Sequence, residues 1–208
     1  EVAEDWEQPS GLQTSIFLLA PLLLGLVEGD RTLRTINETL VHEVEVSASP
    51  QEVWDFILTE KELAKESKNT PISSFLGFPQ HIKTTLDKKE LGGKRIALYE
   101  KSLYFEEIIK VYDEPKELRL EVNTDPDKIS PEVMDEHILI GGEYLDILED
   151  AYVLEALPSG GTRIFLESTY KIRTPFNWYA EYWAKLFLSD VLEGELEFIQ
   201  AHFHNAKT

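Results

Sequence analysis

Glu107 is the residue in this sequence best placed to do chemistry. It alternates with Phe105 and Ile109 in a segment expected to be a strand, so its carboxylate shares a face with apolar side chains. Because a buried carboxylate is costly without a partner, it would hold a ligand hydroxyl or act as an acid or base with a raised pKa. Two alternatives stay open: a register change that turns Glu107 to solvent, or an ion pair with Arg95 or Arg163.

A second set of polar side chains belongs to the C-terminal part of the chain. Ser168 and Tyr170 share a face with apolar residues of a predicted strand, where their hydroxyls could orient the polar end of a ligand. Core hydroxyls satisfied by the protein itself are the commoner arrangement. Glu195 and His202 fall on the apolar stripe of a predicted helix, so they either line a cavity beneath it or extend to water.

Several kinds of chemistry have no support in the sequence. The chain has no cysteine, which excludes disulfides and thiolate catalysis, and its five histidines lack metal-ligand spacing. No nucleophile elbow, phosphate-binding glycine loop or dinucleotide fingerprint is present. We therefore assign no catalytic residue, metal or cofactor. The acidic residues Glu143, Asp146, Glu149 and Asp150 lack the spacing of a calcium loop and are interpreted as a solvated hairpin.

The overall charge limits the partners. Lys and Arg number 20 against 39 Asp and Glu, a formal net charge of −19, which repels nucleic acid and anionic lipid headgroups. At 208 residues and 42% hydrophobic content, the chain is expected to form one domain with an extension. We place the extension at residues 1–36 and the domain at residues 37–208.

Alternation and turn signals predict an antiparallel sheet. The first strand covers Thr39–Ser47, and a capping box with proline at its second position, Ser49-Pro50-Gln51-Glu52, starts a helix that should bury Trp54. Residues 60–69 are a charged helix or loop, and 71–79 an apolar loop. The further strands are predicted at Ile82–Asp87, Lys94–Lys101, Leu103–Tyr112, Glu117–Asn123, Glu143–Ala156 and Thr162–Arg173, with a long loop at 125–142.

A long amphipathic helix is predicted after Pro175. Its apolar stripe comprises Phe187, Leu188, Val191, Leu192, Phe198, Ile199 and Phe203, with Asp190, Glu193, Glu197 and Gln200 opposite. Its first turns carry Trp178, Tyr179, Tyr182 and Trp183, which need a cover. The apolar run Ile16–Val27 is too short to span a membrane alone and is the expected cover. The alternatives are a membrane-surface anchor and a homodimer through this run.

The order strand, capped helix, antiparallel strands and long C-terminal helix resembles the START/polyketide cyclase-like (SRPBCC) superfamily. The likeness is carried by Val44-Glu45-Val46-Ser47-Ala48-Ser49-Pro50-Gln51-Glu52-Val53-Trp54-Asp55-Phe56-Ile57 and by Gly160-Gly161-Thr162-Arg163-Ile164, and covers about residues 39–207. It implies an α+β helix-grip fold, in which a curved antiparallel sheet wraps around the C-terminal helix. It is nearly silent on chemistry, because this scaffold hosts carriers, receptors and enzymes.

The expected function is binding of a lipid or other small hydrophobic ligand in a cavity between the sheet and that helix. The alternative is a cyclase, dehydrase or hydrolase with Glu107 or Tyr170 as acid or base. The residues expected to contact the ligand are Phe105, Glu107, Ile109, Leu120, Ser168, Tyr170, Leu188, Leu192, Glu195 and Ile199.

A narrower resemblance is to bacterial proteins in which such a domain follows several membrane-spanning helices. It is carried by Leu18–Glu28, by Arg31-Thr32-Leu33, and by Thr174-Pro175 before a helix start rich in Tyr and Trp. It implies that this chain is the soluble end of a membrane protein. The sequence itself assigns no compartment.

Overall fold

The computed structural model describes residues 33–59, 61–62, 79, 81–124, 141–175 and 177–205. The chain divides into two units, residues 1–34 and 35–208, and every described helix and strand belongs to the second. The strands are β1 (Ile36–Val46), β2 (Lys61–Glu62), β3 (His81–Leu86), β4 (Lys94–Tyr99), β5 (Tyr104–Asp113), β6 (Glu117–Asn123), β7 (Leu145–Ala156) and β8 (Thr162–Ile172). The helices are α2 (Pro50–Ile57), the 3₁₀ turn η1 (Glu100–Ser102) and α4 (Asn177–Asn205).

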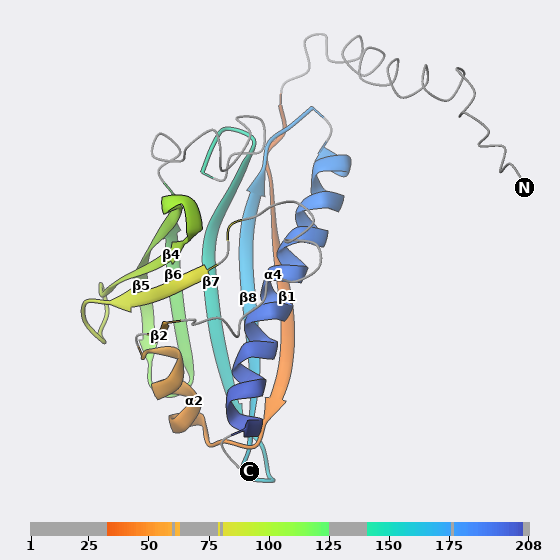
Figure 1. The fold of residues 1–208 in the computed structure, drawn as a ribbon. Coiled ribbons are helices and arrows are strands. Elements are labelled where there is room, and N and C mark those ends of the chain that lie inside the picture. Colours follow the sequence, from red (N-terminus) through yellow and green to blue (C-terminus); the bar gives the residue numbers. More distant parts are fainter. Residues whose placement is uncertain are drawn as a thin grey trace, which may run out of the picture. The chain divides into compact units, whose positions relative to one another are not determined.

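The strands form one antiparallel sheet in the order β1-β8-β7-β6-β5-β4-β3-β2. Figure 1 shows this sheet curving, with α4 lying along β1 and β8. Side chains of β8 alternate strictly between buried and part-exposed positions, because one face of this strand packs under α4. We call the face that α4 covers the inner face. The predicted α+β helix-grip fold is confirmed.

The turn between β7 and β8 requires its two glycines. Gly160 has a φ of +85°, a left-handed conformation that other residues rarely adopt. At Gly161, an added Cβ would lie 2.5 Å from the carbonyl oxygen of Val46, so a larger residue would push β1 away. The buried Thr162 hydroxyl then donates a hydrogen bond of 2.7 Å to the carbonyl of Ala48. These contacts fix β8 against the start of α2.

Helix α2 forms as the sequence predicts. Ser49 is its N-cap, and the reciprocal hydrogen bonds between Ser49 and Glu52 complete the capping box. Trp54 is 1% exposed and packs edge-on against Tyr112 of β5, with 5.2 Å between ring centroids. The predicted burial of Trp54 is confirmed, and α2 closes one end of the core.

Helix α4 buries one stripe against β1 and β8. The stripe comprises Ala184, Leu188, Leu192, Leu196 and Ile199, which recur every three or four residues. Asp190 lies roughly 200° around the helix from Leu188, on the opposite face as predicted. It is nevertheless buried, at 8% exposed. His202 is exposed and stacks on Phe56 of α2, with ring centroids 4.0 Å apart, so it does not line the interior.

The first turns of α4 differ from the rest. Trp178, Tyr179, Tyr182 and Trp183 are all exposed. Their expected cover, Ile16–Val27, lies outside the described residues. Among the residues that the structure describes, no helix is long and apolar enough to cross a membrane.

Two further predictions concern connecting segments. Within 60–69, Lys61 and Glu62 form β2 and pair with β3, whereas a charged helix or loop was expected. This pairing makes β2 the last strand in the order of the described sheet. Residues 63–69, the apolar loop up to residue 78 and most of the long loop, at 125–140, lie outside the described residues.

Candidate functional site

Six polar side chains meet on the inner face of the sheet. We call them the interior polar cluster: Arg95, Glu107, Asp150, Tyr152, Ser168 and Glu195. Strand register brings five of them together: Arg95 of β4 pairs with Glu107 of β5, Asp150 of β7 pairs with Ser168 of β8, and Tyr152 lies two residues after Asp150 on the same face of β7. The sixth, Glu195, comes from α4 and accepts a hydrogen bond of 3.4 Å from the Tyr152 hydroxyl.

The strongest contact in the cluster is an ion pair. Arg95 Nη1 lies 2.8 Å from Glu107 Oε2, and the two residues are 9% and 6% exposed. Burial raises the pKa of Glu107, and the guanidinium of Arg95 opposes that shift. The predicted partner Arg95 is therefore confirmed. Arg163 instead contacts Glu45 at 2.7 Å, and the register that would turn Glu107 to solvent does not occur.

Asp150 is a carboxyl of the cluster that titrates near neutral pH. Its Oδ1 atom is buried and has no hydrogen-bond partner among the described residues, and Ser168 stands opposite Asp150 on the neighbouring strand β8. Burial, and next the negative charge of Glu107, raise the pKa of Asp150 to about 7. Near neutral pH this carboxyl is therefore present in both protonated and ionised forms.

Tyr152 connects the two halves of the cluster. The guanidinium carbon of Arg95 lies 5.9 Å from the centre of its ring, and its hydroxyl reaches Glu195 on α4. Burial raises the pKa of Tyr152 well above its usual value, so its hydroxyl stays protonated and acts as a donor.

Three separate apolar clusters surround these polar groups. The largest includes Ile109, Leu120, Leu154, Ile164, Leu192 and Ile199, the second Ala97, Leu103, Phe105 and Val122, and the third Tyr170, Ile172, Ala184 and Leu188. Strand alternation places members of all three beside Glu107, Asp150 or Ser168. Asp150 and Ile147 remain part-exposed although they point to the inner face. The apolar core is thus interrupted where the polar cluster lies.

The ten residues predicted to contact a ligand all come from elements that enclose this interior. Nine are buried, and Glu195 is part-exposed. Glu107, Ser168 and Glu195 belong to the interior polar cluster. The other seven are distributed over the three apolar clusters: Phe105, Ile109, Leu120, Tyr170, Leu188, Leu192 and Ile199. Whether they contact a ligand stays a prediction.

Tyr170 does not join the polar cluster. Its hydroxyl is buried without a hydrogen-bond partner among the described residues, and the charges acting on it are those of Glu181 and Glu38. Burial raises its pKa to about 12, which makes it a poor acid or base near neutral pH.

The interpretation of the acidic group as a solvated hairpin is wrong for Asp150. Asp146 and Glu149 do lie outward, where they contact Lys171 and Arg119 at 3.3 and 2.7 Å. A register shift between Ile147 and Glu149 sends Asp150 to the inner face. A signal for this was present, because Asp150 alternates with Tyr152 and Leu154.

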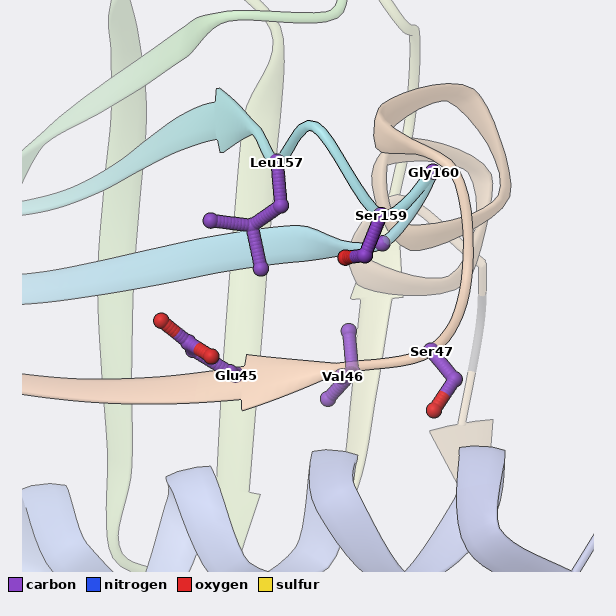
Figure 2. A pocket seen from close by; sticks show the side chains of 7 residues that line it. Glu45, Val46, Ser47, Leu157, Ser159 and Gly160 are labelled. Carbon is purple, nitrogen blue, oxygen red and sulfur yellow. The ribbon is translucent and has the colours of Figure 1, made fainter.

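The structure also has a small surface pocket between the end of β1 and the turn that joins β7 to β8. Figure 2 shows its lining: Glu45, Val46 and Ser47 at the end of β1, and Leu157, Ser159, Gly160 and Gly161 at the turn. Its polar side chains are Glu45, which pairs with Arg163, and the hydroxyls of Ser47 and Ser159. The described residues contain no group of three side chains that could hold a metal ion.

Comparison with known proteins bears on the fold. No protein-family model and no curated protein sequence matches this chain. Among solved structures, a START superfamily protein from Mycobacterium smegmatis superposes with a TM-score of 0.53 at 11% identity, covering 81% of this chain and 98% of its own. A norcoclaurine synthase point mutant from Thalictrum flavum, in complex with a transition state analogue, gives a TM-score of 0.52 at 14% identity, covering 85% and 100%. The chain therefore has the START-type helix-grip fold.

Proposed function

We propose that this protein binds a small, mainly apolar organic molecule between the inner face of the sheet and α4. The observation that carries the proposal is the interior polar cluster, and above all Asp150, whose buried Oδ1 has no hydrogen-bond partner among the described residues. A buried acceptor without a donor is costly in a finished core. A ligand that supplies the donor removes that cost.

The charges of the cluster favour one kind of ligand end. Glu107, Asp150 and Glu195 contribute three carboxyl groups, against the single guanidinium of Arg95, which is already paired with Glu107. An anionic ligand end would meet repulsion here, whereas a hydroxyl or amine would donate to Asp150. We therefore infer a ligand with a hydroxyl or amine end rather than a free fatty acid.

The rest of the ligand would be apolar. The side chains around the polar cluster belong to the three apolar clusters, and binding sites for small molecules usually combine such walls with a few polar groups. The part-exposed Ile147 and Leu145 on the inner face are the described apolar residues best placed to contact it.

The proposal is tested first by mass spectrometry of organic extracts from the purified protein. In parallel, the delipidated protein is titrated with N-phenyl-1-naphthylamine, which fluoresces in apolar surroundings. Decylamine, decanol and decanoate then compete with the bound probe. We expect saturable probe binding, with the amine and alcohol displacing it at least about tenfold more effectively than the acid, which corresponds to one charge-assisted contact.

Two variants distinguish specific binding at Asp150 from nonspecific hydrophobic binding. Asp150→Asn should remove most of the preference for the amine, whereas Asp146→Asn, an outward carboxylate on the same strand, should keep it. If no compound is extracted and no probe binds saturably, the binding proposal is wrong. Saturable binding with decanoate equal to decylamine would refute only the inferred ligand end.

A second candidate is an enzyme that uses acid–base chemistry on the bound molecule. It is favoured by Asp150, because a carboxyl with a pKa of about 7 can both give and take a proton near neutral pH. Glu107 is less suited to act as the acid or base, because its carboxylate forms an ion pair with Arg95. Incubating an extracted compound with the protein would decide: conversion that Asp150→Asn abolishes, with binding retained, supports an enzyme.

A further inference from the structure

We propose that the start of α4 is a surface that contacts a lipid bilayer. This surface, the aromatic end, consists of Trp178, Tyr179, Tyr182 and Trp183, which are 70%, 53%, 61% and 42% exposed. The rings contact one another edge to face, with centroids 5.5 to 6.3 Å apart. The inference is independent of the proposed ligand.

The aromatic end is not part of the core. The buried stripe of α4 begins at Ala184, so the two turns before it carry four large rings that the sheet does not cover. Contiguous exposed apolar surface of this kind usually marks an interaction site. Tyr and Trp combine an apolar ring with a hydrogen-bonding group, and they concentrate at the boundary between lipid headgroups and acyl chains.

The connection of the chain points to the same partner. Ile36, the first residue of β1, pairs with Ile172, the last residue of β8, five residues before α4 begins. The preceding chain therefore enters the domain at the end of the sheet that bears the aromatic end. Residues 28–35 separate Ile36 from the apolar run Ile16–Val27, and eight residues reach at most about 26 Å. The sequence thus has an apolar run shortly before the strand that begins at this end of the sheet.

Local charge indicates which lipids suit this surface. The four rings are uncharged, and the neighbouring Lys185 pairs with Glu181 on the same helix, so no free cation of the described helix start attracts anionic lipid. The chain as a whole carries a net charge of −19, which repels an anionic membrane. We expect binding to zwitterionic phosphatidylcholine that added salt does not weaken.

The test uses the full chain and vesicles of phosphatidylcholine, with co-sedimentation as one readout. Quenching of tryptophan fluorescence by brominated phosphatidylcholine is the other, because it requires rings within the bilayer. Trp178→Ser/Trp183→Ser should weaken vesicle binding at least about tenfold, given the ring area removed, and should lose most of the quenching. Leu91→Ser is the matched control: Leu91 is 65% exposed, at the opposite end of the sheet, and should change neither readout.

Three results would overturn the proposal. Undiminished vesicle binding by the double variant would show that another part of the chain binds lipid alone. Failure of the unsubstituted protein to bind vesicles, with Trp178 and Trp183 protected from acrylamide in solution, would show that protein covers the rings. Concentration-dependent dimers that the double variant abolishes, without vesicle binding, would assign the surface to a second copy. Unchanged circular dichroism confirms that the variant is folded.

Discussion

Replacing Asp150 with asparagine should make the protein more stable at pH 8 and remove part of its pH dependence. In the folded protein, burial and Glu107 raise the pKa of Asp150 from an ordinary value of 3.8 to about 7. In the unfolded chain the carboxyl is in water and regains its ordinary value. The folded state therefore binds this proton more tightly than the unfolded state does.

The direction of the effect follows from proton linkage. Between pH 3.8 and 7 the folded protein keeps the proton that the unfolded chain has lost, so stability falls as pH rises through this window. The slope is about 1.4 kcal/mol per pH unit for one proton. From pH 5 to pH 8 the loss attributable to Asp150 is then about 2.5 kcal/mol, because the slope vanishes above the folded pKa.

The assay is urea denaturation of delipidated protein at pH 5, 6, 7 and 8, followed by circular dichroism. Asp150→Asn cannot titrate, so its stability should decline by about 2.5 kcal/mol less than that of the unsubstituted protein over this range. Asp146→Asn on the outer face, beside Lys171, should keep the original slope. A variant that still shows the full decline would refute the burial and charge argument for Asp150.

Three further substitutions test the fold and the ion pair. Trp54→Ala should cost roughly 3–5 kcal/mol in chemical denaturation, the usual loss for a buried large aromatic, and a loss below about 1 kcal/mol would contradict the packing of α2. Ser49→Ala removes the N-cap of α2 and should cost about 1 kcal/mol; no change would mean that the capping box does not stabilise the helix. Arg95→Met leaves Glu107 buried without its partner, so it should cost about 3 kcal/mol at pH 8 and less at pH 5, where Glu107 can take a proton; equal losses would contradict this reasoning.

Local signals predicted most of the sheet and the first helix. The alternation of β8 is regular because this strand has neighbours on both sides and one face under α4, so each buried position reads directly as apolar or hydroxyl. The capping box of α2 is local chemistry between Ser49 and Glu52 and needs no tertiary contact. Both features could be read without knowing how the chain folds back on itself.

The site was harder to predict, because its members come from distant elements. Alternation placed Glu107 and Ser168 on the inner face, but only strand register shows that Arg95 stands opposite Glu107. Asp150 was assigned to solvent with its acidic neighbours, and the bulge beside Ile147 separates it from them. A single extra residue in β7 reverses which carboxylates face water, and the alternation of Asp150 with Tyr152 and Leu154 is the one local sign of it.

The ionisation of Asp150 should couple the stability of the fold to the proposed ligand binding. The free energy that ionised Asp150 costs the ligand-free fold is regained when a ligand donates to its Oδ1, so an amine should stabilise the protein more where Asp150 is ionised. Saturating decylamine should therefore raise the urea midpoint more at pH 8 than at pH 5. Decane, which has no donor, should raise it equally at both, and Asp150→Asn should remove the difference for decylamine. If decylamine stabilises the unsubstituted protein and Asp150→Asn equally at every pH, the amine does not reach Asp150, and the ligand lies elsewhere on the inner face.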